Sequence, residues 1–107
     1  MDYIKNEYQT ILERKAQQQE GSYTCYLFEQ GIDKILKKVG EECTEMVIAA
    51  KNNDKEETVY EITDLIYHTL VMMANQGITP EDIEAELHKR AEKAGNLKKF
   101  HIVDKNT

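Results

Sequence analysis

Residues 32–76 read IDKILKKVGEECTEMVIAAKNNDKEETVYEITDLIYHTLVMMANQ, and this stretch decides the fold. In its first part, apolar side chains recur at the spacing of one helical face: Ile35, Val39, Cys43, Met46 and Ala50. Turn residues follow at 52–54, and the acidic start at 56–57 and Gly77 at the end predict a second long helix over 55–76. Because the connection is short, the two helices should lie antiparallel as a hairpin.

The segments around the hairpin also favour helices. Apolar spacing predicts a helix over 3–19, and residues 22–28 indicate a loop that leads into a short helix. Thr79, Pro80 and two acids signal another helix start, with a stripe that runs to Ala94. We expect the tail from Asn96 to be irregular. The chain is therefore predicted to be one all-α domain over residues 1–107, a helical hairpin plus flanking helices.

The segment 62–73 is apolar nearly all the way round, which is typical of a helix that is buried on every side. A chain of 107 residues with three long helices has difficulty enclosing such a segment. We therefore expect a four-helix-bundle-like core that is completed in a homodimer, with one side of residues 70–73 facing the partner.

Composition excludes several functions. The 14 basic and 20 acidic residues leave a formal net charge of −6, which disfavours nucleic-acid binding. Two cysteines are too few for a disulfide framework, and the first residues lack the apolar run of a secretory signal. The most apolar stretch, 65–74, is too short to cross a bilayer. We expect a cytoplasmic protein without a membrane partner.

Two acidic pairs lie beside the apolar faces of the hairpin. Glu61 and Asp64 head a stripe that continues as hydrophobic, and Glu42 and Glu45 repeat the same three-residue spacing on the other helix. Four carboxylates between two helices repel each other unless they are neutralised, and Mg²⁺ or Mn²⁺ is the usual neutraliser of an all-oxygen cluster. The pattern indicates a divalent-metal site. The alternative is a solvated acidic surface on a non-catalytic helical interaction module.

Two lysines precede the first acidic pair. Lys34 and Lys38 border the expected metal site, a combination that suits a phosphate chain bridged by metal. Ion pairs from Lys38 to Glu41 or Glu42 along the same helix are an equally good interpretation. His68 follows Asp64 by one turn, and a buried, hydrogen-bonded histidine is favoured there over a metal ligand.

With these residues in view, the chain resembles the phosphoribosyl-ATP pyrophosphatase family of the all-α nucleoside triphosphate pyrophosphatase superfamily. The resemblance runs from about residue 11 to residue 90. Glu-x-x-Glu followed by Glu-x-x-Asp, with 15 residues between Glu45 and Glu61, is the superfamily's metal motif. The motif GSYT at 21–24 and the run DLIYH at 64–68 narrow the resemblance to this family.

The resemblance implies an activity and a set of roles. It implies Mg²⁺-dependent hydrolysis of phosphoribosyl-ATP to phosphoribosyl-AMP and pyrophosphate in histidine biosynthesis. The implied metal ligands are Glu42, Glu45, Glu61 and Asp64. Glu41 would orient the attacking water as base, Lys34 and Lys38 would meet phosphate oxygens, and Ser22, Tyr23 and Thr24 would close over the substrate. A pyrophosphatase for non-standard nucleotides is the alternative enzyme, whereas a di-iron bundle would need Glu-x-x-His twice.

Overall fold

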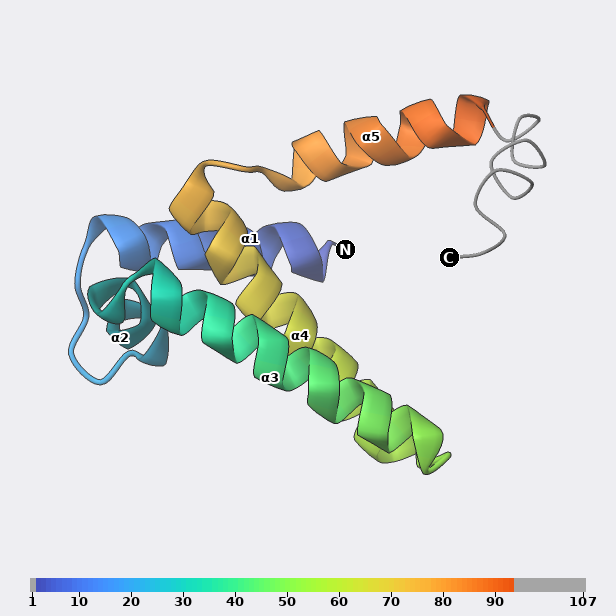
Figure 1. Cartoon of the computed structure of the whole chain (residues 1–107). Helices are drawn as coiled ribbons and strands as arrows, with labels where there is room; N and C mark the ends of the chain where they lie inside the picture. The colour runs from blue at the N-terminus through green and yellow to red at the C-terminus, as the bar shows by residue number, and fades with distance from the viewer. Residues whose placement is uncertain (1, 94–107) are drawn as a thin grey trace.

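The structure, a computed structural model, describes residues 2–93. This part of the chain forms five helices and no strand (Figure 1). They are α1 (Tyr3–Ala16), α2 (Tyr23–Gln30), α3 (Ile32–Lys51), α4 (Lys55–Gln76) and α5 (Pro80–Glu92). The all-α prediction is confirmed, while Ala94 and the predicted tail from Asn96 lie outside the described residues. Over residues 2–93, no helix combines the length and apolar character that crossing a membrane requires.

The hairpin of α3 and α4 forms where the sequence predicts it, and its ends are held by local hydrogen bonds. The side chain of Asp54 accepts a hydrogen bond from the backbone N–H of Glu57 and so caps α4. Asn53, with φ of 57°, takes the left-handed conformation that reverses the chain. Gly77 ends α4 with φ of 74°, a conformation that costs glycine no strain.

A short helix leads into the hairpin. Ser22 accepts a hydrogen bond from the backbone N–H of Cys25, so the predicted loop ends here and α2 begins at Tyr23. The preceding helix stops at Ala16, three residues before the predicted Gln19. Gly31, with φ of 94°, turns the chain from α2 into α3. Residues 22–24 are thereby placed next to the hairpin.

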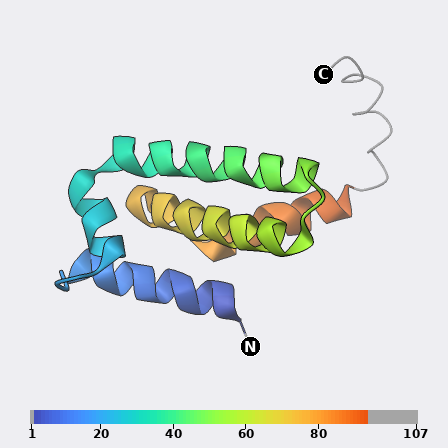
Figure 2. The same ribbon diagram turned by 90° about the horizontal axis from the view of Figure 1, so that it is seen from below.

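The core lies at one end of the hairpin. Helix α4 lies between α3 and α1, and α2 closes the end at which these helices meet (Figure 2). All four helices contribute buried apolar side chains: Tyr8, Ile11, Leu27, Ile35, Leu70, Val71, Met73 and Ala74. The other half of the hairpin extends beyond this core, with Val47, Ile48, Val59 and Tyr60 exposed. The carboxylates lie between these two regions.

The buried face of α3 differs from the predicted stripe. Ile35, Glu42 and Ala49 are buried, whereas Cys43 and Ala50 are exposed. The three buried residues are seven apart, the repeat of a helix that packs along one neighbour with a slight supercoil. This packing directs Glu42, and not Cys43, toward α4, so Glu42 is buried and Cys43 is exposed.

Several apolar side chains are uncovered. On α4, Ile62 and Ile66 are exposed in the single chain, on the segment that the sequence predicted to be enclosed only when a second copy is present. Of residues 70–73, where one side was expected to face a partner, Leu70, Val71 and Met73 are buried within the chain by α1 and α2, and Met72 is half-buried. Helix α5 extends away from the body, and among the described residues it packs only on α1 (Figure 1). Its apolar side chains Ile83 and Leu87 are consequently exposed.

Candidate metal centre

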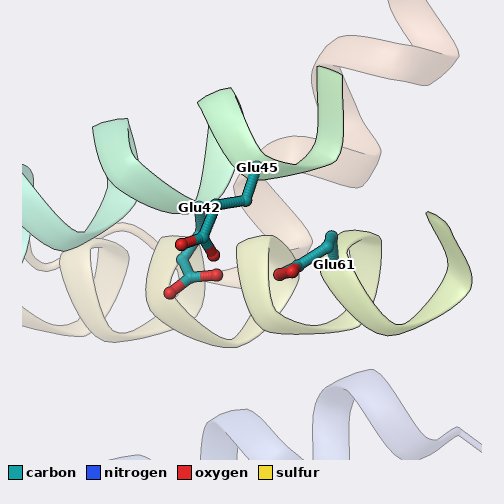
Figure 3. Close-up of side chains that lie close together, drawn as sticks. All are labelled: Glu42, Glu45 and Glu61. Atoms are coloured by element: carbon teal, nitrogen blue, oxygen red, sulfur yellow. The ribbon is translucent and has the colours of Figure 1, made fainter. Parts of the chain in front are cut away.

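Three of the four predicted metal ligands meet between α3 and α4. Each of Glu42, Glu45 and Glu61 offers a carboxylate oxygen, and these oxygens lie within 4.8 Å of one another (Figure 3). Glu42 and Glu61 are buried, with 5% and 8% of their surface exposed, while Glu45 lies at the open side. The seven-residue repeat of α3 places Glu42 against α4 in the layer after Ile35. The carboxylates of α3 and α4 thus meet at the edge of the core.

Two oxygens of this cluster are left without partners. Glu42 Oε2 and Glu61 Oε1 are buried and accept no hydrogen bond in the described structure. A buried polar atom without a partner is costly, and a buried carboxylate is far more costly when it is ionised. Hard divalent cations coordinate such oxygens directly. The residues present therefore fit a Mg²⁺ or Mn²⁺ ion.

The cluster holds its protons more tightly than isolated carboxylates do. Burial raises the pKa of Glu61 to about 7, with further contributions from Glu45 and Glu42. Burial also raises the pKa of Glu42, and the neighbouring Glu45 and Asp64 add to this effect while Lys38 opposes it. The metal-free site consequently carries fewer charges near neutral pH than three free glutamates would. Any cation that binds must displace these protons.

Asp64 and Glu41 stand outside this cluster. Asp64 is half-buried on α4 one turn from His68, and it is close enough to Glu42 to raise the pKa of that carboxyl. Its carboxylate does not belong to the group of three. Glu41 is exposed and lies 3.4 Å from the ammonium of Lys38. Three of the four predicted metal ligands therefore lie together in the structure. The fourth ligand, Asp64, and the predicted base, Glu41, lie beside them.

Lys38 borders the site. Its Nζ lies 3.4 Å from Glu41 Oε1 and 3.5 Å from Glu42 Oε1, so the lysine both pairs along its helix and faces the cluster. Burial lowers the pKa of Lys38, but the neighbouring Tyr23, Glu41 and Glu42 together raise it, and the ammonium stays charged. Lys34 lies one turn earlier on α3, half-buried, and within residues 2–93 it forms no ion pair.

The hydroxyls of residues 22–24 already have partners. Ser22 caps α2, Tyr23 hydrogen-bonds His68 Nε2 at 3.0 Å, and Thr24 hydrogen-bonds the hydroxyl of Tyr67. His68 is buried with both ring nitrogens bonded, which confirms the predicted core histidine. Sequence reasoning gave Tyr67 no role of its own. The position of Tyr67 beside His68 in the run DLIYH was the one feature of the sequence that could have pointed to a role for Tyr67.

A solvent-open recess gives access to the cluster. It has a volume of about 300 Å³ and lies at the turn end of the hairpin, where both helices contribute acidic side chains. Glu45 and Glu61 line it together with Ile48, Ala49, Asn52, Asp54 and Glu57. A hydrated cation can thus approach from the outside while Glu42 stays on the protein side.

These features define a class: an all-α protein whose antiparallel hairpin carries a carboxylate cluster suited to a divalent cation, with a lysine at its border. Comparison with known proteins gives the particular family. The family model described as phosphoribosyl-ATP pyrophosphohydrolase matches residues 5–91. The chain belongs to the phosphoribosyl-ATP pyrophosphohydrolase family.

Individual relatives support the same family assignment. A phosphoribosyl-ATP pyrophosphatase of Clostridium novyi is 53% identical over 92% of this chain and 89% of its own length. One of Clostridium acetobutylicum is 59% identical over 85% of this chain and 83% of its own. A histidine biosynthesis bifunctional protein of Oceanobacillus iheyensis is 62% identical over 79% of this chain, which spans only 40% of that longer protein.

Proposed function

We propose that this protein hydrolyses phosphoribosyl-ATP to phosphoribosyl-AMP and pyrophosphate, the second step of histidine biosynthesis, and that the reaction requires Mg²⁺, which Mn²⁺ can replace. One observation carries the metal requirement: two buried carboxylate oxygens, on Glu42 and Glu61, have no partner within the described chain. Family membership carries the choice of reaction and substrate.

Glu42, Glu45 and Glu61 would hold the metal, and Asp64 lies near enough to join through a water or a side-chain rotation. When bound, Mg²⁺ supplies charge neutralisation for the triphosphate and the departing pyrophosphate, and it makes a bound water more acidic. The fit rests on oxygen ligands alone, the donor type that Mg²⁺ prefers. Ca²⁺ is larger and more loosely coordinated, so we expect it to support the reaction poorly.

The remaining residues act on substrate and water. Lys38 and Lys34 bind phosphate oxygens, and Ser22, Tyr23 and Thr24, at the start of α2, close over the substrate. Glu41 accepts the proton of the water whose oxygen attacks the α-phosphorus; the anhydride bond between the α- and β-phosphates breaks and pyrophosphate leaves. Glu41 suits this role because it is solvent-accessible and is held at 3.4 Å by Lys38.

We propose that the protein works as a homodimer. Ile62 and Ile66 of α4, and Ile83 and Leu87 of α5, are apolar side chains that stay exposed in the part of the chain that the structure describes. A second copy that covers these faces would complete the four-helix-bundle-like core. A cytoplasmic location is consistent with the two free cysteines, Cys25 and Cys43.

The test is pyrophosphate release from three substrates at equal concentration in Mg²⁺. We expect phosphoribosyl-ATP to be turned over with the highest kcat/KM. Preference for dUTP or dCTP would assign the protein to the pyrophosphatases of non-standard nucleotides. Release from no substrate, in a folded protein that also binds no Mg²⁺, would support the non-catalytic helical module.

A further inference from the structure

Two neighbouring residues of α4 hold two neighbouring residues of α2. His68 Nε2 lies 3.0 Å from the hydroxyl oxygen of Tyr23, and the hydroxyl of Tyr67 is hydrogen-bonded to that of Thr24. The rings also pack closely: Tyr67 and His68 meet edge to face at 5.0 Å between centroids, and Tyr23 stacks on Tyr67 at 6.2 Å. The first turn of α2 is thus fixed to α4 by polar and aromatic contacts together.

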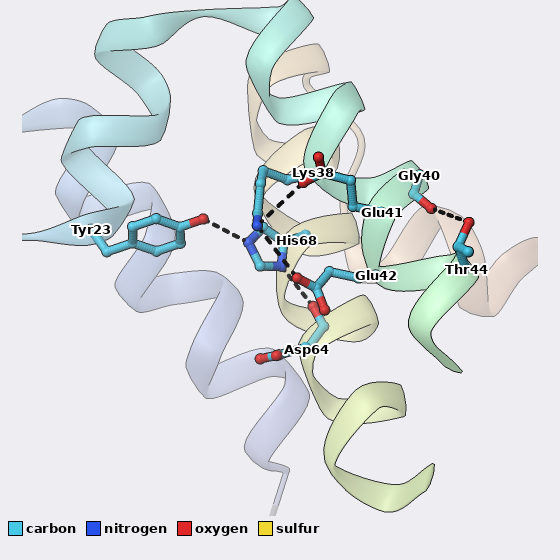
Figure 4. Close-up of polar contacts among 8 residues, drawn as sticks. All are labelled: Tyr23, Lys38, Gly40, Glu41, Glu42, Thr44, Asp64 and His68. Carbon is cyan, nitrogen blue, oxygen red and sulfur yellow. Dashed lines mark hydrogen bonds and ion pairs between the residues drawn. The ribbon is translucent and has the colours of Figure 1, made fainter. Parts of the chain in front are cut away.

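The second ring nitrogen of His68 determines the direction of the bond to Tyr23. Nδ1 lies 2.8 Å from the backbone carbonyl oxygen of Asp64, and a carbonyl oxygen can only accept a hydrogen bond. Nδ1 therefore carries the hydrogen, and in the neutral ring Nε2 is an acceptor. Tyr23 must then donate its hydroxyl hydrogen to Nε2 across the 3.0 Å contact that Figure 4 marks with a dashed line.

This direction limits what Tyr23 can do at the site. An oxygen whose only hydrogen points to His68 presents lone pairs to its other neighbours, so it accepts and does not donate. The nearby cation is Lys38, and the two groups are close enough to shift each other's pKa: Lys38 lowers that of Tyr23, against the larger effect of burial. Tyr23 is therefore suited to face an ammonium group and unsuited to donate to a phosphate oxygen.

We propose that His68 and Tyr67 are positioning residues: they hold Tyr23 and Thr24 so that the first turn of α2 and the ammonium of Lys38 are set at the carboxylate cluster before substrate arrives. His68 is buried, and its hydrogen bonds within residues 2–93 go to Tyr23 and to the Asp64 backbone, so it acts through these partners. Preset geometry of this kind reduces the ordering that binding would otherwise require. The inference rests on the proposed function for its kinetic consequences.

The kinetic test compares two substitutions of His68. His68→Gln places an amide oxygen near the position of Nε2 and keeps an acceptor for Tyr23, whereas His68→Met leaves that hydroxyl without a partner. We expect His68→Met to lower kcat/KM for phosphoribosyl-ATP by about ten-fold, mainly through KM, and His68→Gln to stay within about three-fold of the unmodified protein. A loss of folded protein alone would lower kcat and leave KM unchanged.

A double-mutant cycle supplies the decisive comparison. Tyr23→Phe should lower kcat/KM in the unmodified protein but have almost no further effect in the His68→Met background, because the interaction is already lost there. Tyr26→Phe is the matched control, since Tyr26 lies on the same helix and its hydroxyl has no hydrogen bond within the described chain. Equal effects of Tyr23→Phe in both backgrounds would overturn the proposal, because Tyr23 would then act independently of His68.

A second readout does not depend on activity. Nitrogen-15 NMR of the histidine rings, with His68 identified by its loss in His68→Gln, should show a hydrogen on Nδ1 and an accepting Nε2 whose shift changes in Tyr23→Phe. A ring with the hydrogen on Nε2, or with both nitrogens protonated, would overturn the assignment. An unmodified protein that releases no pyrophosphate would instead overturn the proposed function, and with it any role of His68 in hydrolysis.

Discussion

Replacing Glu45 by glutamine removes one charge from the cluster and keeps the shape of the side chain. The oxygens of Glu42, Glu45 and Glu61 lie within 4.8 Å of one another. Two full charges at that distance repel by about 3.5 kcal/mol at an effective dielectric constant of about 20 and by about 1 kcal/mol in water. Because Glu45 is exposed, the lower figure applies. We therefore expect Glu45→Gln to stabilise the metal-free protein by about 1 kcal/mol, or about 4 °C in Tm, at pH 8, where Glu61 is ionised, and by less at lower pH.

In Mg²⁺ the unmodified protein should have a higher Tm than Glu45→Gln, which is the reverse of the order expected without metal. At a free concentration about 100 times Kd, Mg²⁺ stabilises the folded state by about 2.7 kcal/mol, which raises Tm by about 10 °C for a domain of this size. Glu45→Gln removes a ligand, so its gain should be much smaller. Pyrophosphate release should fall by orders of magnitude at the same time. Stability without metal and activity with metal would thus change in opposite directions.

The assay is a set of thermal melts at one protein concentration, with chelator and with Mg²⁺, for the unmodified protein, Glu45→Gln and the control Glu84→Gln. Glu84 is exposed on α5, so the control removes the same charge away from the cluster. Glu84→Gln should show the same increase in Tm with Mg²⁺ as the unmodified protein, and its Tm in chelator should change little. Equal Mg²⁺ shifts in all three proteins would refute the reasoning, because the carboxylates between α3 and α4 would then not hold the ion.

Three further predictions each concern one side chain: Glu61, Leu87 and Tyr8. The raised pKa of Glu61 means that the folded state binds a proton more tightly than the unfolded state, so the stability it contributes is complete below about pH 4.5 and is lost as pH rises through about 7. Melts in chelator should therefore give a lower Tm at pH 8 than at pH 5, and a rise in Tm over this range would contradict the prediction. Leu87→Glu should weaken the dimer without unfolding the chain, since Leu87 is exposed in the monomer; unchanged sedimentation at micromolar concentration would oppose that placement of the interface. Tyr8→Phe removes the 2.6 Å hydrogen bond to the carbonyl of Ile78 and should cost about 1 kcal/mol in urea unfolding, whereas an unchanged midpoint would mean that water replaces the bond.

Local signals were sufficient to predict the hairpin. Capping residues and apolar spacing predicted α3 and α4 with the bounds that the structure has, because such signals act within one or two turns of the chain. The meeting of Glu42, Glu45 and Glu61 also follows from local rules, once a short turn makes the two helices antiparallel.

Features that depend on how helices pack were harder to predict. Cys43 is exposed and Glu42 buried because contact with α4, and not the hydrophobicity of α3 alone, selects the face. The position of Asp64 outside the group of three depends on side-chain direction, which spacing along a helix does not specify. The bonds from Tyr23 and Thr24 to α4 join residues more than 40 positions apart, and no local pattern indicates such partners.

The most direct test of the account is a Mn²⁺ titration of the metal-free protein, with free Mn²⁺ measured by electron paramagnetic resonance. The unmodified protein should bind Mn²⁺ with an affinity that increases from pH 6 to pH 8, as Glu61 loses its proton. Glu61→Gln should bind it far more weakly, and the loss should be matched by the loss of pyrophosphate release from phosphoribosyl-ATP. Equal Mn²⁺ affinity in the two proteins, or full turnover in excess chelator, would contradict the central claim that this carboxylate cluster holds the catalytic metal.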